Sequence, residues 1–160
     1  MAVTAGQSDL FTNPAASPMV RNTVPDDGGK LRIKRFTYTQ SGAGDAASTV
    51  DLVKLPPGNV RVFPALSRIT CSAFGASRVL DVGWTAYVDL AGAAVAADAN
   101  DMQNDLDVSA AASAALTSTV TGDGSKLFSS QGGVTIQAVV AGGTIPDAAT
   151  LTGYIVYAQE

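Results

Sequence analysis

The feature that most constrains this sequence is a strict alternation of apolar and other residues between Arg78 and Leu90. In a β-strand successive side chains point to opposite faces, so this alternation predicts a half-buried strand. Its apolar face would carry Leu80, Val82, Trp84, Ala86, Val88 and Leu90. We expect Trp84 to lie near the centre of a hydrophobic core, since a buried Trp contributes a large apolar area.

Shorter stretches with the same period of two recur along the chain. We expect further strands at 31–39, 49–55, 60–63, 67–74, 134–140 and 149–158. Along 31–39 the apolar positions change from odd to even numbers at Arg35, which indicates a β-bulge at that residue.

Composition favours strands over helices. Among the 14 acidic residues of this 160-residue chain only Glu160 is a Glu, and Gly, Ala, Thr and Val are abundant. Glu favours helices, whereas Asp and Gly favour turns and Val and Thr favour strands. About eight strands separated by turn signals predict an all-β domain, a β-sandwich of jelly-roll type, over residues 30–160.

The stretch between the strands predicted at 78–90 and 134–140 is less regular in its pattern of apolar residues. The Ala-rich residues 91–99 are compatible with a short helix, the polar residues 98–107 are predicted as a loop, and 109–119 as a loop passing into a strand. A turn is expected at 122–125, with Lys126 as a charge flanking it.

Residues 1–29 differ from the rest of the chain. They contain three prolines, show little periodicity and end in Asp-Asp-Gly-Gly. Two interpretations remain open: a disordered tail, or an extended N-terminal arm that lies on a neighbouring subunit. In the second, the contacts would come from the isolated apolar residues Leu10, Phe11, Met19 and Val20.

The sequence contains no histidine and one cysteine, Cys71. Ser-His-Asp and Cys-His catalysis and His-ligated metal centres are therefore excluded within this chain. Cys71 alternates with Ile69 and Ala73, which predicts a buried, inert thiol. A G-x-G-x-x-A match beginning at Gly42 is not followed by a helix pattern, so it lacks the helix N-terminus that binds phosphate. We expect a protein that is not an enzyme and uses no cofactor.

The densest polar cluster contains the acids Asp98, Asp101, Asp105 and Asp107. Closely spaced oxygen ligands suit Ca²⁺, but the EF-hand spacing and its terminal Glu are missing. A solvated loop is therefore favoured, with a calcium site as the weaker alternative. Asp81 and Asp89 would face outward on one strand as surface acids rather than form a glycosidase pair.

Charge is unevenly divided along the chain. Residues 1–78 carry nine bases and five acids, or +4, and residues 79–160 carry one base and nine acids, or −8, which sum to −4. The division either marks a surface that docks on an oppositely charged partner or is cancelled because the fold interleaves both halves. The negative total argues against nucleic acid binding. No stretch approaches the roughly 20 apolar residues of a membrane helix, so no membrane partner is expected.

Several stretches resemble small structural proteins of tailed-bacteriophage virions. They are "VDLVKLPPGNVRV" (50–62), "RVLDVGWTA" (78–86), "AADANDMQNDLDVSAA" (96–111) and "GGTIPDAATLTGYIVYAQE" (142–160). The resemblance spans residues 30–160 and is to the head-decoration, or cement, group. It implies a jelly roll that forms a homotrimer, binds the major capsid protein on the outer surface of the phage head, is made in the host cytoplasm and has no catalytic residues.

Two functional hypotheses follow. In the first, the arm and the basic residues Arg32, Lys34 and Arg35 contact the capsid or a neighbouring subunit. The alternative is a carbohydrate- or receptor-binding β-sandwich module, as in an adhesin or a tail component. Such a module would need exposed aromatic side chains.

Overall fold

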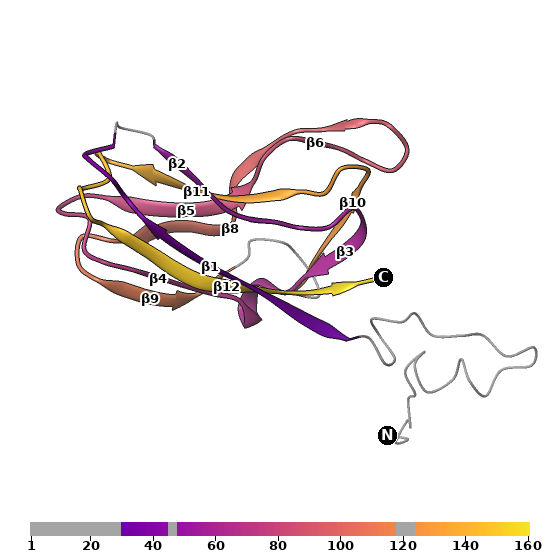
Figure 1. Cartoon of the computed structure of the whole chain (residues 1–160), viewed down its shortest axis with the longest axis horizontal. Coiled ribbons are helices and arrows are strands. Elements are labelled where there is room, and N and C mark those ends of the chain that lie inside the picture. The colour runs from indigo at the N-terminus through magenta and orange to yellow at the C-terminus, as the bar shows by residue number, and fades with distance from the viewer. Residues whose placement is uncertain (1–29, 45–47, 118–123) are drawn as a thin grey trace, which may run out of the picture.

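The structure is a computed structural model, and it describes residues 30–44, 48–117 and 124–160. Two antiparallel sheets pack face to face (Figure 1). Sheet A contains β1 (Leu31–Thr39), β3 (Gly58–Val62), β4 (Arg68–Cys71), β9 (Ala112–Ala115), β10 (Lys126–Ser130) and β12 (Thr150–Gln159). Sheet B contains β2 (Thr49–Lys54), β5 (Val79–Trp84), β8 (Asp98–Asp107) and β11 (Thr135–Ala141). A separate hairpin is formed by β6 (Tyr87–Val88) and β7 (Ala94–Val95), and a 3-10 turn, η2, spans Pro64–Leu66.

Strand pairing is fully nested. β1 pairs with β12, β2 with β11, β3 with β10, β4 with β9, β5 with β8 and β6 with β7, all antiparallel. The chain is therefore one long hairpin with its tip between β6 and β7. The hairpin is wrapped so that β12 also pairs with β4 and β11 also pairs with β5.

The resulting strand orders confirm the predicted fold class. Sheet A contains the order β1-β12-β4-β9, and sheet B has the order β2-β11-β5-β8. This is the two-Greek-key arrangement of a jelly roll. β3 and β4 occupy one strand position of the fold in two segments, as do β9 and β10. The roughly eight strands expected of a jelly roll are thus present, two of them interrupted.

The core lies between the two sheets. In β11 the alternate residues Ile136, Ala138 and Val140 are buried, which matches the predicted strand at 134–140. Trp84 at the end of β5 is buried and packs edge to face on Phe128, with ring centroids 5.2 Å apart. The prediction that Trp84 belongs to the core is confirmed.

The strand predicted over 78–90 is shorter than its alternation suggested. β5 ends at Trp84, and Val88 and Leu90, expected to be buried, are 45% and 49% exposed. They belong to the β6–β7 hairpin, which projects at one end of the sandwich (Figure 1). The Oδ1 atom of Asp89 accepts a hydrogen bond from the N–H of Ala93 and closes this hairpin. The prediction failed because a projecting hairpin has the same period of two as a strand inside a sheet.

The bulge predicted at Arg35 is wrong. β1 pairs with β12 in unbroken register from Leu31 to Thr39. The change of phase arises because Leu31 and Ile33 point to solvent, whereas Phe36 points into the core. Apolar residues therefore occupy both faces of one regular strand.

Strands also replace the helix and the loop predicted between 91 and 107. β7 lies where the short helix was expected, and β8 takes the place of the polar loop, with two irregularities in its register against β5. Within β8, Met102 and Gln103 are buried. β9 confirms the predicted passage from loop to strand within 109–119, while β10 was not predicted.

Residues 1–29, assigned to an arm, lie outside the described residues, as do 45–47 of the Gly-rich match and 122–123 of the predicted turn.

Within the described ranges, no helix has the length and apolar character needed to cross a bilayer.

The close approach of β8 to β5 depends on Gly83. A Cβ atom at this position would lie 1.9 Å from the backbone oxygen of Asp98, so any side chain must displace β8. We predict that Gly83→Ala lowers the free energy of unfolding by about 1–3 kcal/mol, the usual cost of overpacking. Urea denaturation followed by tryptophan fluorescence measures this change.

Gly132 provides the matched control. A Cβ atom there meets nothing within 4 Å, and its φ lies outside the left-handed region. Gly132→Ala should change the free energy of unfolding by less than about 0.5 kcal/mol. Equal effects of the two substitutions would contradict the proposed role of Gly83.

Candidate contact surface

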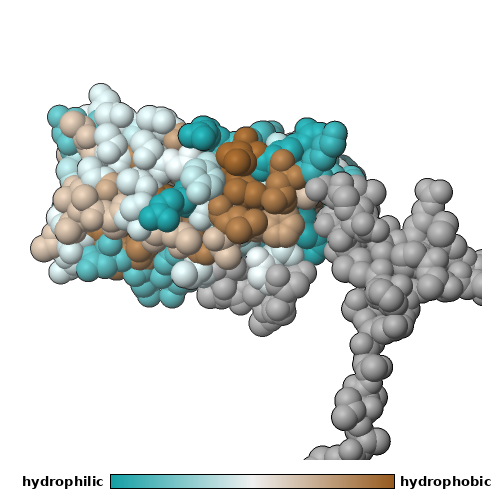
Figure 2. Space-filling view, turned by 90° about the horizontal axis from the view of Figure 1, so that it is seen from below, coloured by the Kyte–Doolittle hydropathy of each residue, from teal (hydrophilic) through white to brown (hydrophobic). Residues whose placement is uncertain are grey.

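The outer face of sheet A carries the most exposed large apolar side chains in the described part of the chain. Leu31 and Ile33 of β1 are each 57% exposed, and Leu66 of η2 is 53% exposed. Together with Tyr154 and Val156 of β12 they line a shallow hollow of about 430 Å³. We call these five residues the apolar patch. Figure 2 views this side of the sandwich and shows the aliphatic side chains of the patch as a brown area.

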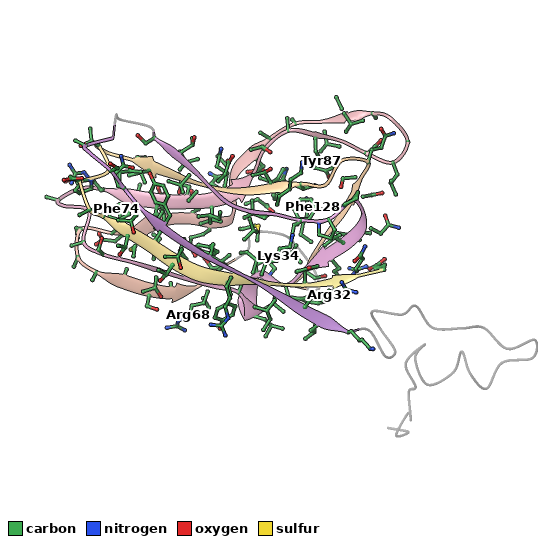
Figure 3. The ribbon with its side chains drawn as sticks, viewed as in Figure 1. Arg32, Lys34, Arg68, Phe74, Tyr87 and Phe128 are labelled. Carbon is green, nitrogen blue, oxygen red and sulfur yellow. The ribbon has the colours of Figure 1, made fainter. Side chains whose placement is uncertain are left out.

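Arginines border the apolar patch. The strand register places Arg35 of β1, Tyr154 of β12 and Arg68 of β4 next to one another in one row across the sheet. The Nε–H of Arg68 donates to the Oγ of Ser113 on β9 at 3.0 Å, which fixes the direction of the guanidinium group. Arg68 points away from the sandwich (Figure 3). Exposed apolar groups next to Arg and Tyr are the typical composition of a protein–protein contact.

Charge is sorted between the two sheets. The strands of sheet A contain six bases and no acid: Arg32, Lys34, Arg35, Arg61, Arg68 and Lys126. The strands of sheet B contain Lys54 and six acids: Asp51, Asp81, Asp98, Asp101, Asp105 and Asp107. Both halves of the chain supply strands to both sheets, yet the charges of the strands separate by sheet. Within sheet A, Arg61 is balanced by an ion pair of 2.9 Å with Glu160, which directly follows β12.

Four of these acids lie on the outer face of sheet B, and we call Asp51, Asp81, Asp105 and Asp107 the acidic face. The Oδ1 atom of Asp81 accepts a hydrogen bond of 2.7 Å from the N–H of Asp105. The Oδ1 atom of Asp51 accepts one of 2.8 Å from Nε2 of Gln137. Hydrogen bonds from Ser109 lower the pKa of Asp107 below its ordinary value, so this carboxyl group stays ionised at neutral pH.

The acids considered for calcium are strung along a strand. Because β8 is extended, Asp98 and Asp107 lie up to about 30 Å apart. Among the described residues no three acidic or thiol side chains gather into a group that could hold a metal ion. Asp81 and Asp89, expected on one strand, lie on β5 and in the β6–β7 turn, and each accepts a backbone N–H. Asp81 and Asp89 thus hold neighbouring backbone in place.

The structure distinguishes the three basic residues predicted to contact a partner. Arg35 lies on the outer face beside the apolar patch, and Arg32 is exposed near the start of β1. Lys34 points to the other side of β1, where its Nζ donates to the backbone oxygen of Lys54 and ties sheet A to sheet B. Their contact with a partner stays a prediction. The arm residues Leu10, Phe11, Met19 and Val20 lie outside the described residues.

Sequence reasoning missed the apolar patch itself. The change of phase at Arg35 is the one sign in the sequence that Leu31 and Ile33 face outward. A bulge, which would keep all apolar residues of the strand on one face, explains the same change. Leu66 follows Pro64 in a 3-10 turn, where no period of two applies.

Lys126 has a role that the sequence did not suggest. It begins β10, and its Nζ lies 4.4 Å from the centroid of the Trp84 ring, a cation–π distance. The charge therefore covers the edge of the core at Trp84, whose ring packs on Phe128.

Cys71 is a buried thiol, as predicted. Burial raises the pKa of Cys71 above its ordinary value because the thiolate would be poorly solvated. We predict that the folded protein reacts with a thiol reagent at pH 8 far more slowly than the protein unfolded in urea, where the pKa returns to about 8.5. Absorbance of the chromophore that the reagent releases measures both rates, and equal rates would contradict the burial of the thiol.

The fold can be compared with known proteins. No family model matches this chain, and no curated protein matches it. A chain in the capsid asymmetric unit of cyanophage Pam1 is similar, with a TM-score of 0.56 and 16% identity over 91% of this chain and 97% of that chain. A chain in the capsid of Ralstonia phage GP4 has a TM-score of 0.60 and 20% identity over 88% of this chain and 91% of that chain. At these identities the likeness shows a shared fold.

Proposed function

We propose that the protein is a structural component of a bacteriophage virion, a decoration or cement protein of the head. It binds the major capsid protein on the outer surface of the shell, associates as a homotrimer and stabilises the head through contacts between subunits. The observation that carries the proposal is the likeness of fold over nearly the whole chain to chains of two phage capsids.

The surface chemistry supports a role in contact rather than catalysis. The apolar patch, the neighbouring arginines and the acidic face are extended surfaces on rigid strands. The sequence has no histidine, and its one thiol is buried. These features favour a protein that is not an enzyme.

The carbohydrate- or receptor-binding alternative lacks a supporting observation. It would need exposed aromatic rings, but no aromatic side chain in the described part of the chain is fully exposed, and Tyr154 of the apolar patch and Phe63 are half-buried. Trp84, Phe74 and Phe128 are buried, and Tyr87 packs against the core.

Purified virus particles test the proposal. In particles of the virus that encodes this chain, quantitative mass spectrometry should find it in a copy number comparable to that of the major capsid protein. Particles from a deletion mutant should release their DNA at a lower temperature, and adding back the purified protein should restore the original temperature. Absence from the particles, or a copy number typical of a single neck or tail ring, would contradict a decoration role.

The N-terminal segment provides a second test. We predict that a variant lacking residues 1–29 binds shells from the deletion mutant more weakly than the full chain. Co-sedimentation with the shells measures the bound fraction, and far-UV circular dichroism checks that the sandwich is intact. Unchanged occupancy would show that residues 1–29 make no contribution to docking.

A further inference from the structure

We infer that the protein associates with itself through two different faces: the apolar patch and the arginines beside it on one copy dock on the acidic face of a second copy. The inference goes beyond the proposed function, because it specifies a contact between copies other than the one that would close a homotrimer. It names the partner of the apolar patch as another copy of this chain.

The apolar patch has the features of a surface that is covered by another protein. Leu31, Ile33 and Leu66 are each more than half exposed although they adjoin one another around one hollow. Clustered apolar side chains rimmed by polar ones mark interaction sites on soluble proteins, whereas singly exposed ones do not. Arg35 and Arg68 form the rim on the side toward β4 and β9.

Charge disfavours a symmetric pairing of this face, or of its edge strand β1, with the same part of a second copy. β1 is an edge strand, since its only ladder partner in the described structure is β12. Joining two copies edge to edge at β1 would bring together Arg32, Lys34 and Arg35 of both. Like charges placed opposite one another destabilise a strand pair, and bases on an edge strand prevent such pairing. Docking two apolar patches on each other would likewise bring Arg35 and Arg68 of both copies together, so a surface that carries carboxylates is the better partner.

The acidic face has the complementary chemistry. Asp51, Asp105 and Asp107 are exposed on it. The register places Val139 beside Asp81 and Val79 beside Asp107, so apolar side chains lie between the acids and can meet the apolar patch. Arginine and carboxylate groups form paired hydrogen bonds of the strongest kind, and these would fix the docked orientation.

The two faces lie on opposite sheets, so the contact is heterologous. Because the two faces point in opposite directions, docking stacks copies one after another and leaves one face of each kind open at the ends of the stack. This contact is therefore separate from the contact that would close the homotrimer of the proposed function. The contact combines burial of apolar side chains with charge pairs. Added salt therefore weakens the charge pairs but leaves the contribution of apolar burial.

Exchange of charges between faces tests the inference. The first variant, Arg35→Glu with Arg68→Glu, makes the sheet A face acidic. The second variant, Asp51→Lys with Asp107→Lys, makes the sheet B face basic. All four side chains are exposed, and circular dichroism with thermal denaturation checks that both variants keep the fold. Analytical ultracentrifugation measures association of the full chain, of each variant and of their equimolar mixture.

We expect the unaltered chain to form oligomers and each variant alone to raise the dissociation constant by at least about tenfold. The mixture should regain association, because the unchanged face of each variant fits the unchanged face of the other. Oligomers of both variants as stable as those of the unaltered chain, or a mixture no more associated than its components, would overturn the inference.

A second pair of variants tests the apolar term. Ile33→Ser removes apolar surface from the patch and should weaken association. Leu90→Ser removes a similarly exposed side chain from the β6–β7 hairpin, outside both faces, and should leave association unchanged. A monomeric unaltered chain would overturn this inference but not the proposed function, which is decided separately by the presence of the protein in purified particles.

Discussion

The nested pairing of strands is the constraint on which the rest of the structure depends. Each strand finds its partner at the mirror position of the chain, from β6 and β7 at the tip to β1 and β12 at the ends. The outer pairs therefore join residues far apart in sequence, such as Leu31 and Ala158. Such contacts carry a large loop-closure cost unless the inner pairs form first. The order of strands in both sheets, and hence the identity of the faces, follows from this one pattern.

Nesting also explains how charge becomes sorted. The wrapped hairpin sends β1, β3 and β4 with their bases into the same sheet as β9, β10 and β12, which contain no acid. The acidic β8 joins β5 and β11 in the other sheet. A division of charge along the sequence thus becomes a division across the thickness of the sandwich. The outer face of sheet A then presents Arg35 and Arg68, whereas the outer face of sheet B presents Asp51, Asp105 and Asp107.

The sequence predicted the parts of the fold in which local pattern and burial agree. Trp84 and Cys71 alternate with apolar neighbours and lie in the core. The β8 strand could not be predicted, because its Asp and Asn residues favour turns, and only its ladder with β5 and the space left by Gly83 hold it extended. The apolar patch was hidden for the opposite reason. Local pattern cannot tell an apolar side chain that faces the core from one that faces outward, so the exposure of Leu31 and Ile33 could not be predicted.

The pairing of the first and last strands has a mechanical consequence. Leu31 lies opposite Ala158, so the start of β1 and the end of β12 are at the same end of the sandwich. A force pulling these two points apart would break the hydrogen bonds of the β1–β12 ladder one pair after another, starting at this end, rather than all together. The domain therefore resists tension between its two ends only through one hydrogen-bonded pair at a time.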